Sequence, residues 1–279
     1  MATINGQDIT ATWQMILLKD SLGSLLKYPK RKNVNYTNFA ENNGINPDLR
    51  KFETESKQVT LKFFMKADSE PEFRTKYNSF FAVINSTDYL ILDFGLGITH
   101  KVRYDKTTSY SAPKILYKNT DKTGEFTMNF IEDENPVNKS VISPSGGIPL
   151  KGVYKINGVD FGDFGIHPDG NTGEALKYAD VKEPFDDGRE KYLGVRNLKH
   201  KETSIPLWFI ADTKAQFINN YQAFWNSFAK TGLQLLYVKE IDREIDVYYT
   251  NCNNYSVSFG QKYCARFSLS FVIPKVTWL

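Results

Sequence analysis

The chain has 279 residues, of which 41% are hydrophobic and 24% are charged, and its formal net charge is +3. This balance is typical of a globular chain that buries a sizeable core, and it excludes a disordered chain. A charge so near neutrality also argues against a nucleic-acid-binding protein, which needs a far more basic face. The 20 Phe and 16 Tyr residues favour pleated sheets and protein–protein contacts.

Targeting and redox signals are weak along the chain. No segment approaches the ~18–20 continuous apolar residues of a membrane helix, and the first residues, MATINGQDIT, lack the layout of a signal peptide. Two cysteines, Cys252 and Cys264, are too few for a disulfide framework. They are expected to be free thiols, unless they face each other across a hairpin. We therefore expect a cytoplasmic protein without membrane insertion.

The chain begins with a turn, followed by a basic run and a long polar insertion. Ile4–Asp8 reads INGQD, and Asn-Gly is turn chemistry. The run 27–32, KYPKRK, has three open interpretations: a phosphate contact to DNA or a membrane surface, a solvated loop, or an inter-subunit salt-bridge site. The insertion Tyr28–Lys57 lacks periodicity. Loops beyond ~12–15 residues are often functional, so we expect this one to contact a partner.

A strand, a helix and a second strand come next. Val59–Ala67 alternates apolar and polar residues, which predicts a half-buried strand, and Asp68 or Ser69 is the expected helix N-cap. An aromatic stripe at helical spacing predicts a helix packed on a sheet; its members are Phe73, Tyr77, Phe80, Phe81 and Ile84. Further strands are predicted at Tyr89–Phe94 and Phe126–Ile131.

The second half repeats this succession: alternation predicts a strand over Ile205–Ala211, Asp212 or Thr213 is the expected helix N-cap, and a second aromatic stripe comprises Phe217, Tyr221, Phe224, Trp225 and Phe228. Thr203–Leu236 aligns with Val59–Leu92 without a gap at an offset of 144, and seven of the 34 aligned residues are identical. Ile156–Asp160 repeats the opening turn, and a closing strand is predicted at Phe267–Val272. A second polar insertion, roughly His167–Glu202, lies at the position of the first. Such long-period similarity indicates an internal duplication.

The residues between the two copies predict a linker. Residues 134–151 are rich in Pro and Gly and lack periodicity. The expected fold class is therefore mainly β (α+β), with two tandem β-sandwich or barrel domains, each carrying one packed α-helix. Their expected bounds are 1–133 and 152–279.

Catalytic and ligand-binding motifs are missing from the sequence. The three histidines, His100, His167 and His200, do not pair with Cys, His or carboxylates at metal-ligand spacings, and no Gly-rich phosphate loop occurs. Glu244 and Asp246 share a face of the predicted strand 241–249, where a solvated surface is expected. We therefore expect a protein that is not an enzyme and has no cofactor and no metal.

The succession of elements resembles the phage tail-tube fold family. The strand–helix–strand units Val59–Phe94 and Thr203–Val238 carry this resemblance, together with the closing strands Phe126–Ile131 and Phe267–Val272 and the INGxD openings. That family includes tail tube proteins, distal tail proteins, baseplate hub proteins and the type VI secretion tube. The resemblance covers most of both halves, and it implies two tail-tube-like domains in a virion structural protein.

The resemblance also implies partners and an assembly. Rings in this family hold six domains, so three two-domain chains would form a pseudo-hexamer, as hub proteins do, whereas a distal tail protein would use six chains. Other tail proteins are the further partners, DNA would pass non-specifically through a lumen, and the chain would end up in the virion tail. The expected inter-subunit contact residues are Tyr28, Arg31, Tyr36, Phe39, Arg50, Phe64, Tyr178, Phe185, Arg189, Tyr192 and Trp208.

A second hypothesis is a carbohydrate- or surface-binding β module. Phe64 and Trp208 lie at matched positions of the two copies, on the nominally polar face of their strands. Exposed aromatic rings in such places stack on sugars, unless another sheet or a neighbouring domain covers the face.

Overall fold

The structure is a computed structural model, and it describes residues 2–275 except 20, 40–41, 86–88, 112–121, 138, 148–151 and 171–196. The described part divides into two compact units. Unit 1 comprises Met1–Pro29, Glu55–Val137 and Tyr255–Val257, and unit 2 comprises Lys30–Thr54, Asn138–Asn254 and Ser258–Leu279. This grouping differs from the predicted domain bounds chiefly in one segment, because Lys30–Thr54 belongs to the second unit.

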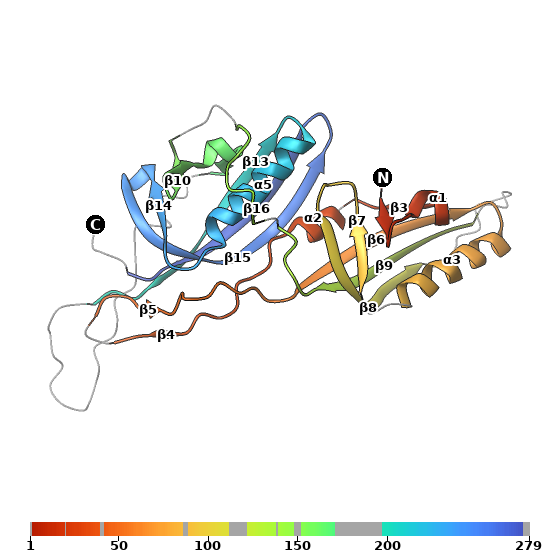
Figure 1. The fold of residues 1–279 in the computed structure, drawn as a ribbon, viewed down its shortest axis with the longest axis horizontal. Helices are drawn as coiled ribbons and strands as arrows, with labels where there is room; N and C mark the ends of the chain where they lie inside the picture. Colours follow the sequence, from red (N-terminus) through yellow and green to blue (C-terminus); the bar gives the residue numbers. More distant parts are fainter. Residues whose placement is uncertain are drawn as a thin grey trace. The chain divides into compact units, whose positions relative to one another are not determined.

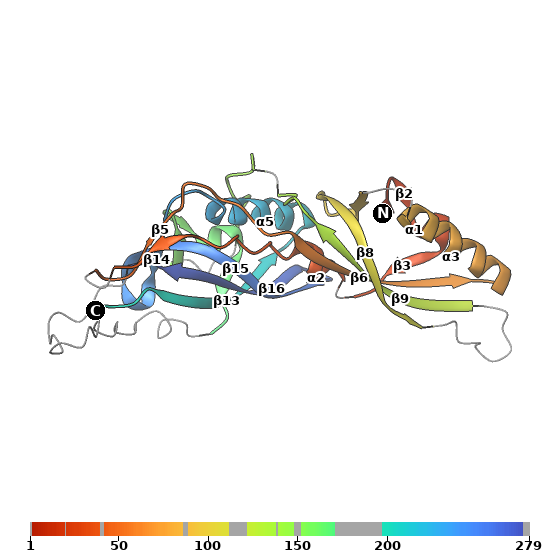
Figure 2. The same cartoon turned by 90° about the horizontal axis from the view of Figure 1, so that it is seen from below.

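Unit 1 is a seven-stranded sheet with one long helix (Figure 1). The strand order is β2-β1-β7-β8-β9-β6-β3, and the pairings given for these strands are antiparallel. The strands are β1 (Thr3–Ile4), β2 (Gln7–Asp8), β3 (Met15–Leu17), β6 (Lys57–Ala67), β7 (Leu90–Asp93), β8 (Thr99–Ser111) and β9 (Lys122–Glu132). The helices are α1 (Ile9–Trp13), α2 (Ser21–Leu26) and α3 (Glu70–Asn85). Figure 2 shows α3 running along one face of the sheet.

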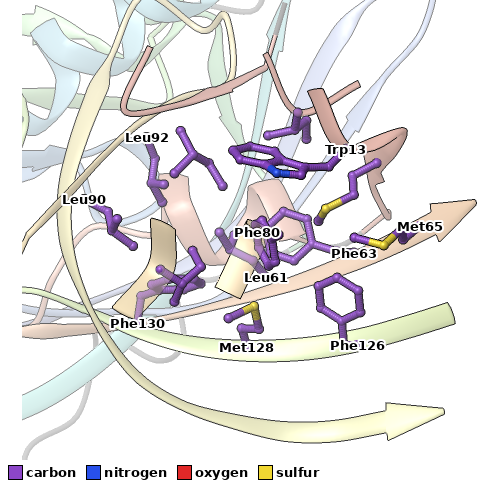
Figure 3. Packing of buried hydrophobic residues seen from close by; sticks show 14 of the residues in the cluster. Trp13, Leu61, Phe63, Met65, Phe80, Leu90, Leu92, Phe126, Met128 and Phe130 are labelled. Atoms are coloured by element: carbon purple, nitrogen blue, oxygen red, sulfur yellow. The ribbon is translucent and has the colours of Figure 1, made fainter. Parts of the chain in front are cut away.

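The core of unit 1 lies between that face and the helices. Alternate residues of β6 from Lys57 to Ala67 are buried, as the period of two predicts. Trp13 packs edge-on against Phe80 of α3, with ring centroids 5.4 Å apart, and its indole Nε1 donates to Ser79 Oγ over 3.0 Å. Phe63 and Phe126 join them from neighbouring strands (Figure 3). The aromatic stripe is thus core packing.

Unit 2 contains a second seven-stranded sheet, in the order β11-β10-β14-β15-β16-β13-β12. Its strands are β10 (Tyr154–Ile156), β11 (Val159–Asp160), β12 (Ile166–Pro168), β13 (Lys201–Ala211), β14 (Gln234–Val238), β15 (Arg243–Phe259) and β16 (Tyr263–Ile273). Its helices are η1 (Phe161–Phe164), α5 (Lys214–Phe228) and η2 (Lys239–Ile241), and β4 (Tyr36–Thr37) pairs with β5 (Asn46–Pro47) in a separate hairpin. The mainly β fold with a helix in each unit is confirmed.

The two sheets have the same strand order, with β1, β2, β3, β6, β7, β8 and β9 of unit 1 in the places of β10, β11, β12, β13, β14, β15 and β16. The opening turns also match in detail. Asn5 and Asn157 both have a left-handed backbone, with φ of 51° and 50°. The Asn5 side chain accepts from Ile91 N over 2.8 Å, and that of Asn157 accepts from Leu235 N over 3.0 Å. Two independent folds would not be expected to share such local chemistry.

Both long helices start with the same reciprocal cap. Ser69 Oγ accepts from Glu72 N, and the Glu72 carboxylate accepts from Asp68 N over 3.0 Å. In unit 2, Thr213 Oγ1 accepts from Gln216 N over 3.1 Å, while the Gln216 amide oxygen accepts from Asp212 N over 2.8 Å. This is the capping-box arrangement. It selects Ser69 over Asp68 as the N-cap of α3 and Thr213 over Asp212 as that of α5.

Part of the predicted linker is bound to α5. The Asn226 amide donates to Val141 O over 2.8 Å, and the Asn219 amide donates to Ser143 O over 3.0 Å. Asn220 is fully buried; its Oδ1 accepts from Ser145 N over 2.8 Å, and its Nδ2 donates to Gly146 O over 2.6 Å. Residues 141–146 are thus held by a row of amide side chains, which no periodicity in the sequence indicated.

Three smaller expectations concern residues of β15 and β16. The predicted strand 241–249 begins at Arg243, because η2 ends there with Asp242 in a left-handed conformation at φ 47°. Glu244 and Asp246 lie exposed on this strand, as expected of a solvated face. Cys252 is buried, Cys264 is half-buried, and the two do not form a disulfide with each other.

Candidate interaction surface

The first polar insertion docks on the sheet of unit 2. We call residues Lys30–Thr54 the arm. Arg31 N donates to Thr250 O of β15 over 2.8 Å. Further along, Gly44 N donates to Leu198 O and Ile45 N donates to Pro274 O, each over 2.8 Å. The arm therefore forms backbone hydrogen bonds with the rest of unit 2 both before β4 and directly before β5.

Apolar packing reinforces this docking. Ile45 and Leu49 of the arm form a buried cluster with Tyr248 and Val272 of the sheet. The close approach needs a glycine at Gly44, where φ is +69° and a Cβ would come within 1.7 Å of Pro274 O. The arm is thus an integral part of the fold of unit 2.

Arg31 is the most enclosed cation of the arm. Its guanidinium lies over the rings of Phe52 and Tyr248, 5.0 and 5.6 Å from their centroids, and Nη2 donates to Lys51 O over 3.0 Å. Burial lowers the pKa of Arg31, but the guanidinium stays charged at pH 7 because the ordinary pKa of arginine lies far above that pH. Burial also raises the pKa of Tyr248 to about 12, so its phenol is neutral at pH 7. The cation therefore holds the arm by stacking and a backbone hydrogen bond.

Two shallow clefts border the arm. One, of about 620 Å³, lies among arm residues from Arg31 to Glu53, and the other, of about 580 Å³, lies between the arm and β15–β16. The charged side chains of the arm that line these clefts are largely paired with one another. Lys32 contacts Glu53 over 3.0 Å, and Arg50 contacts Asp48 over 2.6 Å. The hydrogen bond from Arg50 lowers the pKa of Asp48 to about 2.

The expected contact residues of the arm region divide into two groups. Tyr28 and Arg31 are buried within their own chain, which leaves them little surface for a partner. Tyr36 and Phe39 are about half exposed, at 51% and 52%, and Arg50 is exposed as well. The expected contacts Tyr178, Phe185, Arg189 and Tyr192 lie outside the described residues. Contact with a partner stays a prediction for all of them.

Phe64 and Trp208 occupy equivalent register positions on the outer faces of their sheets. Phe64 faces Ile16 of the edge strand β3, and Trp208 faces His167 of the edge strand β12. The Trp208 ring stacks on His167, with centroids 6.0 Å apart, and Arg266 lies 4.0 Å over its centroid. Side chains of its own unit therefore cover Trp208, which weakens the sugar-stacking hypothesis.

A buried ionic cluster in unit 1 is the group that sequence reasoning missed. Glu132 of β9 contacts His100 Nδ1 over 2.7 Å and Lys57 Nζ over 2.5 Å, and Lys57 also donates to Leu25 O over 2.6 Å. Burial alone would raise the pKa of Glu132, but the hydrogen bond with His100 and the charge of Lys57 outweigh it and lower that pKa. The sequence held one signal for this cluster, because His100 lies at an inward-facing position of the strand β8.

The cluster has the geometry of a structural ion network, enclosed in the core. Among the described residues, no group of three or more His, Cys, Asp or Glu could hold a metal ion. Over the same residues, no helix combines the length and apolarity that a membrane span requires.

The chain is similar to a protein of known structure. No family model matches the chain, and no curated protein matches it. A search of solved structures finds the Dit protein (gp 19.1) of SPP1, described as a paradigm of the hub adsorption apparatus in phages that infect Gram-positive hosts. That chain is 8% identical, the match covers 97% of each chain, and the TM-score is 0.32. The similarity therefore extends over almost the whole length of both chains, with a low TM-score.

Proposed function

We propose that the chain is a non-catalytic structural protein of a phage or prophage tail, positioned at the tube end or in the baseplate hub, that assembles into a ring. The proposal rests on the two seven-stranded sheets, which share one strand order. Their opening turns and the caps of their long helices also match. This repeated strand–helix–strand unit has the order of elements by which the sequence resembles the tail-tube family.

A duplicated fold suits a ring because equivalent surfaces occur twice in each chain. Two units per chain let three chains supply six positions, with heterologous contacts that close on themselves. The exposed aromatic residues Tyr36 and Phe39 of the arm would then contact neighbouring chains or other tail proteins. Duplication, closure and stoichiometry are parts of this proposal.

The carbohydrate-binding alternative has less support. It requires an accessible aromatic platform, and Trp208 is covered by Arg266 on the outer face of its sheet.

Light scattering over a concentration series tests the proposal. Each chain contributes 32.0 kDa, so a trimer gives about 96 kDa and a hexamer about 192 kDa. A trimer is expected for a hub, and a hexamer would favour the distal tail position. A chain that stays monomeric at the highest concentration, alone and with its tail partners, would contradict ring assembly.

A further inference from the structure

An exposed apolar stripe runs over β7 and β8 of unit 1. We call it stripe 1; it comprises Tyr89, Ile91 and Lys101. Tyr89 and Ile91 are 39% and 41% exposed, which is high for large apolar residues beside a sheet. Lys101 is the register partner of Ile91, and its ammonium lies 4.6 Å over the Tyr89 ring. Stripe 1 is thus apolar with an exposed cation at its centre.

A corresponding stripe runs over β14 and β15 of unit 2. Stripe 2 comprises Leu233, Leu235, Glu244 and Asp246. Leu233 and Leu235 are 41% and 38% exposed. Asp246 is the register partner of Leu235, and Glu244 is that of Tyr237. Within the described residues, neither carboxylate has an ion pair or a side-chain hydrogen bond. Stripe 2 is thus apolar with unpaired acids beside it.

The two stripes occupy the same place on the repeated fold. The offset of 144 aligns Tyr89 with Leu233 and Ile91 with Leu235. In each sheet the residue opposite the second apolar position is charged, and the sign changes from Lys101 in unit 1 to Asp246 in unit 2. Equivalent surfaces are therefore apolar in both units, and the charge at this one register position is reversed, although Lys155 also lies over Tyr237 beside stripe 2 and Asp133 accepts from the Tyr89 hydroxyl beside stripe 1.

Stripe 2 also borders a recess. A cleft of about 340 Å³ is lined by Leu233 and Asp246 together with Ile45 and Leu49 of the arm. Its lining is mostly apolar and includes two charged residues, Asp246 and Lys275. An apolar side chain next to an ammonium fits such a cleft, and Ile91 beside Lys101 offers that combination.

We propose that stripe 1 of one chain docks on stripe 2 of a second copy, with Lys101 against Asp246 and Glu244. Docking like on like would bring lysine to lysine or acid to acid, so the charges select the unlike pair. Such a head-to-tail contact uses different patches on the two chains and can propagate until it closes. This inference rests on the proposed ring and names its interface.

Charge reversal tests the pairing. Lys101→Glu alone and Asp246→Lys alone should each raise the dissociation concentration by about 10-fold or more, because a like pair replaces an unlike pair at the contact. The double variant should return to within about 3-fold of the parent chain. An equimolar mixture of the two single variants should also associate, because each then meets an opposite charge on the other. Light scattering and sedimentation velocity measure the masses.

Matched controls separate the contact from general effects. Lys106→Glu makes the same charge change on the same exposed strand outside the stripe, and it should leave association unchanged. Leu235→Ser should weaken association about 10-fold, while Ile142→Ser, at a position 71% exposed, should have little effect. Thermal unfolding of each variant checks that the fold persists.

The outcomes distinguish this interface from the wider proposal. If the parent chain forms oligomers that the single variants do not weaken, or if the double variant and the mixture fail to recover, the stripe pairing is wrong and the ring survives. A parent chain that remains monomeric contradicts both.

Discussion

The two long helices occupy the same place in the repeated fold, yet their outer faces differ. In α3, buried residues are confined to Phe73, Phe80 and Ile84, and its outer face carries the i,i+4 ion pairs Arg74–Glu70 and Lys76–Glu72. In α5, nearly the whole second half is buried, including Asn220 and Asn226, which bind residues 141–146. A shared scaffold thus carries a solvated helix in unit 1 and an enclosed helix in unit 2.

This contrast shows how two units with the same strand order differ in their outer faces. The inward aromatic positions are kept because the sheet must be covered in both units. The outward positions are free to change, and amides at Asn219, Asn220 and Asn226 satisfy the backbone of a passing segment. The variants below compare equivalent positions, from the largest expected effect to the smallest.

The largest effect is expected at the aromatic pair Trp225 and Phe81, which the offset of 144 aligns. Trp225 is fully enclosed and contacts Tyr249 and Phe267, so Trp225→Ala should lower the free energy of unfolding by about 3–5 kcal/mol. Phe81 is half-buried, and Phe81→Ala should cost clearly less. Chemical denaturation measures both; equal losses would contradict the difference in enclosure.

The variant Gly147→Ala tests whether the segment 141–147, which lies beside α5, must approach η1 closely. A Cβ at this position would come within 1.6 Å of Gly162 O, so Gly147→Ala must displace backbone and should cost about 1–3 kcal/mol. Gly260→Ala is the control, because its Cβ meets nothing within 4 Å. Hydrogen exchange should show faster exchange of residues 141–147 in Gly147→Ala alone. Unchanged exchange there would refute the close approach.

The equivalent polar residues Asn220 and Lys76 should differ as well. Asn220→Ala removes the side-chain acceptor of Ser145 N and the amide donor to Phe164 O and Gly146 O, of which Gly146 O keeps Gln216 as a second donor, and it should cost about 1–3 kcal/mol. Lys76→Ala removes one partly buried i,i+4 ion pair, with an expected cost of about 0–1 kcal/mol. Thermal unfolding of the two variants gives the comparison, and a larger loss in Lys76→Ala would reverse it.

The most graded effect is the acid sensitivity of unit 1. The pKa of Glu132 is lowered in the folded state, so its stabilising contribution is present above the unfolded value of about 4.3 and is lost as pH falls through the folded value. In unit 2 the register partner of Lys201 is Ile273, which does not titrate. Hydrogen exchange at decreasing pH should show unit 1 opening first.

Glu132→Gln is the variant that isolates this titration. It should destabilise unit 1 at pH 7, because Lys57 loses its buried partner, and it should flatten the dependence of stability on pH below 5. A pH dependence as steep as that of the parent chain would show that other carboxylates cause it.

Local signals predicted the elements well because each depended on a few neighbouring residues. The aromatic stripes gave both helices, alternation gave β6 and β13, and Ser69 and Thr213 were among the expected caps. Pairings between distant segments could not be predicted in the same way. The Asn220 amide carries no signal for Gly146, and polar insertion residues carry none for the sheet on which they dock.

The surroundings of the candidate contact residues could not be predicted from the sequence, for a similar reason. Arg31 was chosen because it lies in a basic run, and the run does not show that Phe52 and Tyr248 enclose it. The exposed residues of the two stripes have unremarkable types, and only the strand register places Lys101 and Asp246 at equivalent positions. The charge pairing that we propose between the two stripes therefore depends on the register of both sheets.

The most direct test of the account is imaging of the largest purified species by negative-stain electron microscopy. The account predicts class averages of an open ring with six similar lobes, formed by three chains with a total mass of about 96 kDa. Closed particles without a central opening, or rings whose lobes do not come in equivalent pairs, would contradict a ring built from two matched units per chain.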